Sequence, residues 1–300
     1  MVRTKNASFN KETYPVGEVE KPTEEEETRG DDSEKTDSNP ESDSGDSTES
    51  EEESEEGTEV MQPVNMYFNR YEYMKPFKLS AKCYITRTVD FLRAHLKSHE
   101  LDWLLGHPQF KHFFHMPNDA NHKLMGMWML LLRTASIEKK KECWFIVNGT
   151  PIRYSLKTMA LISGLYCHEY PRDMETLGSN EFVGKHFGVG TTIRYDDVQA
   201  KLLSMKRASP DRVKMAVLNF LCSVIIGKKK AGKKAPSVEP FFLRAIDDLD
   251  MCKTFPWGRL AFDENMKDIF HCMNHFGGVL STNQWVFPSF VIPLEVIIEL

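Results

Sequence analysis

These 300 residues contain no apolar run long enough to cross a membrane, and we expect no secretory leader. Residues 1–21 have no apolar core of the kind that a signal peptide needs. The longest purely apolar run, Met127–Leu132, is far short of the roughly 20 residues that span a bilayer. We therefore expect a protein that is not secreted, does not engage membranes and works inside the cell.

Paired cysteines are also missing. The six cysteines are widely spaced, and no CxxC pair occurs among Cys83, Cys143, Cys167, Cys222, Cys252 and Cys272. Several stand in apolar runs, where cysteine usually behaves as a small buried hydrophobe. This usage favours structural thiols in a reducing, intracellular compartment.

Complete catalytic motifs are absent as well. Gly184–Gly190 (GKHFGVG) lacks the spacing of a P-loop or a dinucleotide fingerprint. Cys167 and His168 are adjacent, whereas a catalytic Cys–His pair usually converges from distant parts of the chain. We predict a protein that is not an enzyme and needs no cofactor. A thiol enzyme at Cys167 stays open as an alternative.

Histidines, in contrast, crowd into one stretch. Six of the ten lie in residues 95–122: His95, His99, His107, His112, His115 and His122. His95 and His99 are four residues apart on a predicted helix, which can bring two imidazoles to one metal. The glutamate of a metalloprotease motif is missing between them. A weaker group is His271, Cys272 and His275, with Cys252 upstream. We expect surface or packing histidines and no metal, with a metal hydrolase as the alternative.

Charge divides the chain into two parts. Residues 1–60 carry 21 acidic and 6 basic side chains, a net charge of −15, and residues 61–300 carry 23 acidic and 32 basic ones, a net charge of +9. The first part has few large apolar residues, so we predict a disordered acidic tail. Ser38, Thr48 and Ser50 each precede a glutamate by three positions, the pattern of acid-directed phosphorylation.

The basic part contains a lysine cluster in a predicted loop, residues 227–237. Its members are Lys228, Lys229, Lys230, Lys233 and Lys234. Such a cluster can contact nucleic-acid phosphates or serve as a nuclear import signal; an ordinary solvated loop is the alternative. No recognition helix, RNA-binding aromatic motif or zinc finger is present, so binding should depend little on base sequence. The partner we expect is nucleic acid or a nuclear protein, and the expected location is nuclear, otherwise cytoplasmic.

Residues 61–300 predict a single α+β domain, predominantly helical, with a small β-hairpin. Trp144–Val147 and Ile152–Tyr154 read as strands around an Asn148-Gly149 turn. Ser155 is placed to cap a helix over residues 156–161 that Gly164 ends.

Apolar spacing predicts further helices. They cover residues 81–96, 98–105, a stretch after 118–119 that stops near 136, 210–226, 241–249 and 260–273; residues 178–192 form a loop with a short helical turn at 185–187. The expected core consists of Leu92, Leu96, Trp103, Leu131, Phe145, Leu161, Phe220, Ile225, Phe242, Phe262 and Phe270.

The central stretch resembles a known family. Trp144–Cys167 (WFIVNGTPIRYSLKTMALISGLYC) is similar to the signature of the plant DUF1985 domain, and Leu105–Pro117, Asp211–Leu221 and Phe255–Phe262 fit the same family in order. The plant mobile domain has a comparable strand–turn–strand–helix but fits less well. The resemblance implies a transposon-derived or transposon-associated module of unknown molecular activity, acting in protein or nucleic-acid interaction in the nucleus.

The resemblance also bears on the end of the chain. The resemblance implies that many relatives carry a downstream cysteine-protease domain similar to SUMO-processing enzymes; we expect this chain to lack it, and no protease residues are transferred. A remnant of such a polyprotein, with the protease lost, is a further alternative. Because the family's domain continues past Leu300, we expect a truncated copy whose apolar segment Phe290–Leu300 leaves the core unclosed.

Overall fold

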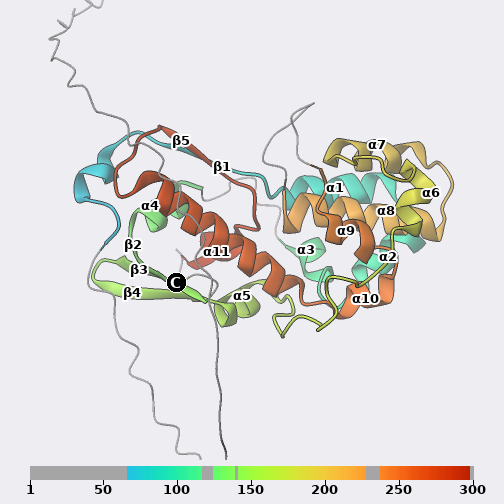
Figure 1. Ribbon diagram of the computed structural model, residues 1–300, viewed down its shortest axis with the longest axis horizontal. Coiled ribbons are helices and arrows are strands. Elements are labelled where there is room, and N and C mark those ends of the chain that lie inside the picture. The colour runs from blue at the N-terminus through green and yellow to red at the C-terminus, as the bar shows by residue number, and fades with distance from the viewer. Residues whose placement is uncertain (1–65, 117–123, 139–140, 228–236, 298–300) are drawn as a thin grey trace, which may run out of the picture. The chain divides into compact units, whose positions relative to one another are not determined.

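Helices dominate the computed structural model, which describes residues 66–116, 124–138, 141–227 and 237–297 (Figure 1). All of them fall within one compact unit, Glu59–Leu300. The predominantly helical α+β class with its small hairpin is therefore confirmed. The predicted tail with Ser38, Thr48 and Ser50, His122 and the lysines of residues 228–234 lie outside the described residues. No helix in the described ranges has the length and hydropathy that a bilayer crossing requires.

The predicted hairpin is present. Strands β3 (Glu142–Val147) and β4 (Thr150–Ser155) pair antiparallel from Val147 opposite Thr150 to Glu142 opposite Ser155. Asn148 and Gly149 both have positive φ, 52° and 81°, as a type I′ turn requires.

A third strand was not predicted. Strand β2 (Thr134–Glu138) pairs antiparallel with β3. Helix α4 (Leu124–Leu132) therefore ends earlier than the predicted stop near residue 136. The Thr134 hydroxyl donates to the Leu131 carbonyl at 2.7 Å, so the strand's first side chain closes the end of the helix.

A second, two-stranded sheet joins the two ends of the domain. β1 (Lys78–Ala81) runs parallel to β5 (Gln284–Phe287), with Lys78 opposite Gln284 (Figure 1). The 3₁₀ helix η1 (Arg70–Met74) precedes it. More than 200 residues separate the paired strands, so local sequence carries no signal for this pairing.

Several helices follow the prediction closely. α1 (Ile85–His95) and α2 (Ser98–Leu105) are present, and α5 (Leu156–Ser163) begins where the Ser155 hydroxyl accepts from the Thr158 amide. Gly164, with φ of 68°, ends α5 as expected. α11 (Trp257–Phe276) ends at Gly277, which also has positive φ.

Other helices differ from the prediction. α6 (Glu181–Phe187) extends the predicted short turn, while α3 (Lys111–His115), α7 (Tyr195–Ser204) and α12 (Ile292–Ile297) were not predicted. The predicted 241–249 helix is two helices, α9 (Pro240–Ala245) and α10 (Leu249–Thr254). The Asp248 carboxylate starts α10 by accepting from the Asp250 and Met251 amides, and the chain bends before it.

The predicted 210–226 helix is α8 (Pro210–Phe220) followed by a π-helical turn, η2 (Leu221–Ile225). The Ser209 hydroxyl accepts from the Arg212 amide at 3.2 Å, as an N-cap does. α8 packs against α2 and α7, and η2 packs against α1 (Figure 1).

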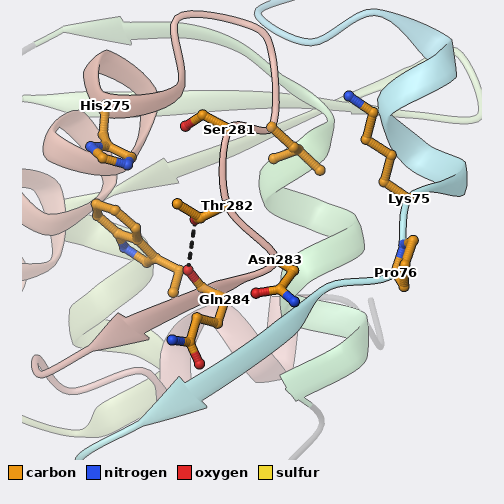
Figure 2. A pocket seen from close by; sticks show the side chains of 9 residues that line it. Lys75, Pro76, His275, Ser281, Thr282, Asn283 and Gln284 are labelled. Carbon is orange, nitrogen blue, oxygen red and sulfur yellow. Dashed lines mark hydrogen bonds between the residues drawn. The ribbon is translucent and has the colours of Figure 1, made fainter. Parts of the chain in front are cut away.

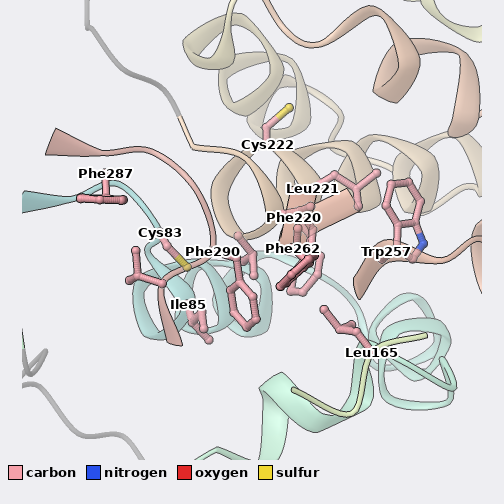
Figure 3. Packing of buried hydrophobic residues seen from close by; sticks show 14 of the residues in the cluster. Cys83, Ile85, Leu165, Phe220, Leu221, Cys222, Trp257, Phe262, Phe287 and Phe290 are labelled. Carbon is pink, nitrogen blue, oxygen red and sulfur yellow. The ribbon is translucent and has the colours of Figure 1, made fainter. Parts of the chain in front are cut away.

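The core forms where α8, α11 and the segment before α12 meet. Figure 3 shows Phe220, Phe262 and Phe290 coming together there; all three are buried. Burial of Phe290, Val291 and Leu294 shows that the expectation of an unclosed core is wrong for the described part of the C-terminal segment.

Most of the predicted core is confirmed. The buried members are Leu92, Leu131, Phe145, Phe220, Ile225, Phe242 and Phe262, and Leu96, Trp103 and Phe270 are half-buried. The assignment of Leu161 to the core is wrong, because this residue is 76% exposed. It stands two residues from the buried Met159, roughly on the opposite side of α5.

Candidate nucleic-acid interface

The two ends of the predicted basic loop are held by backbone pairing. At one end the Gly227 amide donates to the Pro288 carbonyl at 2.8 Å, and Ile226 bridges to Ser289. At the other end Ser237 bridges to Arg194, and the Val238 amide donates to the Ile193 carbonyl at 2.8 Å. The chain that carries the lysines therefore starts beside η2 and finishes beside the start of α7.

Gly227 is required by a close backbone contact, not by a left-handed conformation. A Cβ built on it would lie 2.2 Å from the Lys82 carbonyl oxygen, a distance that no side chain tolerates. The Tyr84 amide next to this contact donates to the Ser223 carbonyl at 3.0 Å. The segment that leads into α1 is thereby fixed against η2.

A cavity of about 150 Å³ opens among the elements that hold the loop's ends. We call it the α1–α7–α8 pocket. Its lining comes from the start of α1, the first turns of α7, and the α8–η2 junction: Lys82, Tyr84, Arg87, Thr88, Phe91, Tyr195, Asp196, Gln199, Asn219, Cys222 and Ser223.

Two polar side chains of the pocket are nearly buried and lack partners. Thr88 and Asn219 are each 5% exposed, and neither side chain hydrogen-bonds to any other described residue. Neither side chain has a fully buried polar atom without a partner, so their polar atoms face the open space of the pocket. Water or a ligand in the pocket would supply the missing hydrogen bonds.

Basic side chains surround the pocket. Lys82 and Arg87 line it, and neither forms an ion pair within the described part of the chain. Arg194 adjoins Tyr195, and its Nε is buried without a hydrogen-bond partner among described atoms. Asp196 also lines the pocket and Glu239 follows the loop's far end, so the region is basic but not exclusively so.

Sequence reasoning located the lysines but missed the pocket. Lys82, Arg87 and Tyr195 stand in segments without any motif. Asn219 could have been recognised from the sequence, because it is the one polar residue between Ala216 and Cys222 in an otherwise apolar stretch of the predicted helix.

His107 is a structural side chain. It is fully buried, its Nδ1 accepts from the Gln109 and Phe110 amides, and its Nε2 lies 3.2 Å from the Cys252 carbonyl oxygen. Burial lowers the pKa of His107 to about 4, against a smaller opposing effect of the Cys252 carbonyl. Neither ring nitrogen is available to a metal.

The other predicted histidine sites do not converge. His95 Nδ1 bonds to the Phe91 carbonyl, and His112 packs beneath Gly164. His271 and His275 lie against Trp285, with ring centroids 5.4 and 4.8 Å away, while Cys272 is buried. Among the described residues, no group of three or more His, Cys, Asp or Glu side chains is arranged to hold a metal.

Cys167 and His168 are likewise not brought together. His168 directs its ring nitrogens to the Glu169 and Thr254 carbonyls at 2.9 and 3.0 Å. The Cys167 thiol is half-buried and lies 3.6 Å from the Leu165 carbonyl oxygen. Burial raises the pKa of Cys167 to about 11, although Arg259 opposes the shift. A thiol with a raised pKa is a poor nucleophile at neutral pH.

Larger cavities lie elsewhere, and two of them exceed 700 Å³. One, about 740 Å³, has Lys75 and Pro76 on one side and Thr282 to Gln284 on the other (Figure 2). Lys75, which lines this cavity, forms an ion pair with Glu72 at 2.7 Å. The other, about 720 Å³, lies along α11, where the Tyr170 hydroxyl donates to Asp263 at 2.7 Å. Neither adjoins an end of the basic loop.

The described residues form a helix-rich α+β domain with a small antiparallel sheet. Residues 131–268 match the family model described as domain of unknown function (DUF1985), so this stretch of the chain is similar to that family. The matched range holds the hairpin, α5, α7 and α8, and it includes the pocket residues of α7 and α8 but not those of α1.

A plant relative extends the match. The chain is 41% identical over 210 residues to an uncharacterized protein of Arabidopsis thaliana, covering 70% of this chain and 26% of the relative. The chain thus spans about a quarter of that relative's length. No solved structure matches the chain.

Proposed function

We propose that this protein is a non-enzymatic nucleic-acid-binding module that acts in the nucleus and derives from a transposon. The observation that carries the binding role is the anchoring of both ends of the lysine-rich segment beside Lys82, Arg87 and Arg194. The segment carries five lysines in sequence, and its described ends lie near Lys82, Arg87 and Arg194, whose side chains have no acidic partner within the described residues. Such a concentration of basic side chains supports phosphate binding.

Binding through phosphates has a definite signature. Each neutralised phosphate releases counterions, so log affinity falls with log salt by about 0.9 per neutralised phosphate on duplex DNA and about 0.7 on single strands. We expect fluorescence anisotropy of labelled DNA and RNA, titrated with the full chain, to show this linear decline. No binding at about 50 mM salt would refute the proposal.

Variants locate the surface. Replacing both Lys82 and Arg87 by alanine should weaken binding several-fold and reduce the salt slope by about 1 for each phosphate that is no longer neutralised. Alanine at Lys111 and Lys157, exposed lysines on α3 and α5, removes the same charge elsewhere and serves as the control. Equal effects of the two pairs would show that net charge, not this surface, drives binding.

The lysine segment is tested in the same assay. Replacing Lys228, Lys229, Lys230, Lys233 and Lys234 by alanine should lower affinity further than the Lys82/Arg87 change. The nuclear location is tested separately by imaging this variant in plant cells. If affinity survives and import is abolished, the segment is an import signal only.

A further inference from the structure

The α1–α7–α8 pocket has the size of a single aromatic ring. A dry apolar cavity of about 150 Å³ holds one benzene molecule, and this pocket has the same volume of about 150 Å³. Unlike that cavity, it has polar lining. Its contents should therefore be a small ring that also carries hydrogen-bonding groups.

Aromatic side chains come to the pocket from two helices. Tyr84 and Phe91 belong to the α1 side and Tyr195 to α7. Aromatic rings are the platforms on which proteins stack unpaired bases, because every base has a π-face. This composition suits a planar heterocycle better than a sugar or an aliphatic group.

The polar side chains match the edge of such a ring. The Asn219 amide has both a donor and an acceptor end, and Gln199 offers a second amide. Asn219 is nearly buried and has no hydrogen-bonding partner within the described residues. A pyrimidine presents adjacent donor and acceptor groups on its pairing edge, which would satisfy this amide.

We propose that the pocket receives one unstacked base of a single-stranded nucleic acid, while Lys82 and Arg87 contact the flanking phosphates. This inference rests on the proposed function and names the form of its ligand. A base inside a duplex is paired and stacked, and extruding it costs a few kcal/mol. The pocket should therefore favour single strands.

The test compares binding of the full chain to labelled oligothymidylate, oligouridylate and a mixed-sequence DNA duplex of equal length. We expect tighter binding to the single strands than to the duplex. The thymidylate and uridylate arms show whether DNA or RNA is preferred. Replacing Tyr195 by alanine should weaken single-strand binding by about tenfold, the usual effect of removing one base–aromatic stack.

Asn219→Leu keeps the side-chain volume and removes the amide. It should weaken single-strand binding several-fold and leave the salt slope and duplex affinity unchanged, because Asn219 is not charged. Asn274→Leu, an exposed residue on α11, is the matched control. Urea unfolding of each variant shows that a loss of affinity is not a loss of fold.

The outcomes separate the two proposals. Absence of binding to every oligonucleotide overturns the proposed function and this inference with it. Salt-dependent binding with equal affinity for single and double strands overturns this inference alone. The same holds if folded Asn219→Leu and Tyr195→Ala proteins bind as the unchanged protein does, since the pocket then holds only water.

Discussion

His107 illustrates how one buried side chain can organise its neighbours. Its ring stacks on Phe110 with centroids 3.8 Å apart and an angle of 5° between the planes. Nδ1 accepts two amide hydrogens, so the proton resides on Nε2, which donates to the Cys252 carbonyl. The neutral ring thereby joins the turn after α2 to α10.

This arrangement predicts a pH dependence of stability. The folded-state pKa of His107 is about 4, whereas an unfolded histidine titrates near 6.5. Between these values the unfolded chain binds a proton that the folded chain does not, so the free energy of unfolding falls as pH decreases from about 6.5 to 4. The decrease from this group approaches about 3 kcal/mol.

Urea unfolding at several pH values measures this decrease. A His107→Gln variant is less stable overall, but its stability should fall less steeply over the same pH interval. Parallel curves for the two proteins would show that His107 is not the group responsible.

Among the elements, α2 and α8 are joined by a buried ion pair. Glu100 and Arg212 bond side chain to side chain, with 1% and 7% of each residue exposed. Glu100 also accepts from the Lys97 and Ser209 amides at 2.9 and 3.3 Å, and Arg212 donates to the His95 carbonyl. The starts of both helices and the end of α1 are therefore held by one pair of charges.

Removing one partner should be costly. Arg212→Ala leaves the Glu100 carboxylate buried and unpaired, which typically costs about 3–5 kcal/mol. Asp211 is next to Arg212 on α8 and forms a more exposed ion pair with Lys185 of α6. Lys185→Ala breaks this pair and should cost at most about 1 kcal/mol. The free energy of unfolding in urea distinguishes the two. Similar decreases would mean that the Glu100–Arg212 pair is as solvated as the exposed one.

On the scale of the whole molecule, charge is strongly asymmetric. Residues 1–60 carry a net charge of −15 and residues 61–300 a net charge of +9. The acidic part is tethered to the basic one, so it can compete with nucleic acid for the same cations. Phosphate on Ser38, Thr48 or Ser50 adds about −1.5 to −2 charges per site and would strengthen the competition.

Deleting residues 1–58, the stretch before the compact unit Glu59–Leu300, should raise the apparent affinity for nucleic acid. The difference should shrink as salt rises, because screening weakens exposed charges. Anisotropy titrations of the two proteins at low and high salt measure it. Unchanged affinity at low salt would show that the acidic segment does not compete.

The candidate site was only partly predictable. The lysines were identified from composition, and their role stays a prediction because they lie outside the described residues. Arg87, Tyr195 and Asn219 belong to three elements, α1, α7 and α8, and only folding brings them to one pocket. Even α7, which supplies Tyr195, was not predicted, because its apolar face is limited to residues such as Val198 and Leu202.

By itself, the sequence determined the features that depend on a few consecutive residues. The Asn148-Gly149 turn, the Ser155 cap and the Gly164 stop follow from backbone preferences that act within one turn of chain. Tertiary structure alone decided which apolar side chains are buried, as the exposed Leu161 shows. It also decided the pairing of β1 with β5 and the closing of the pocket. These depend on contacts between residues far apart in the chain, which no local propensity encodes.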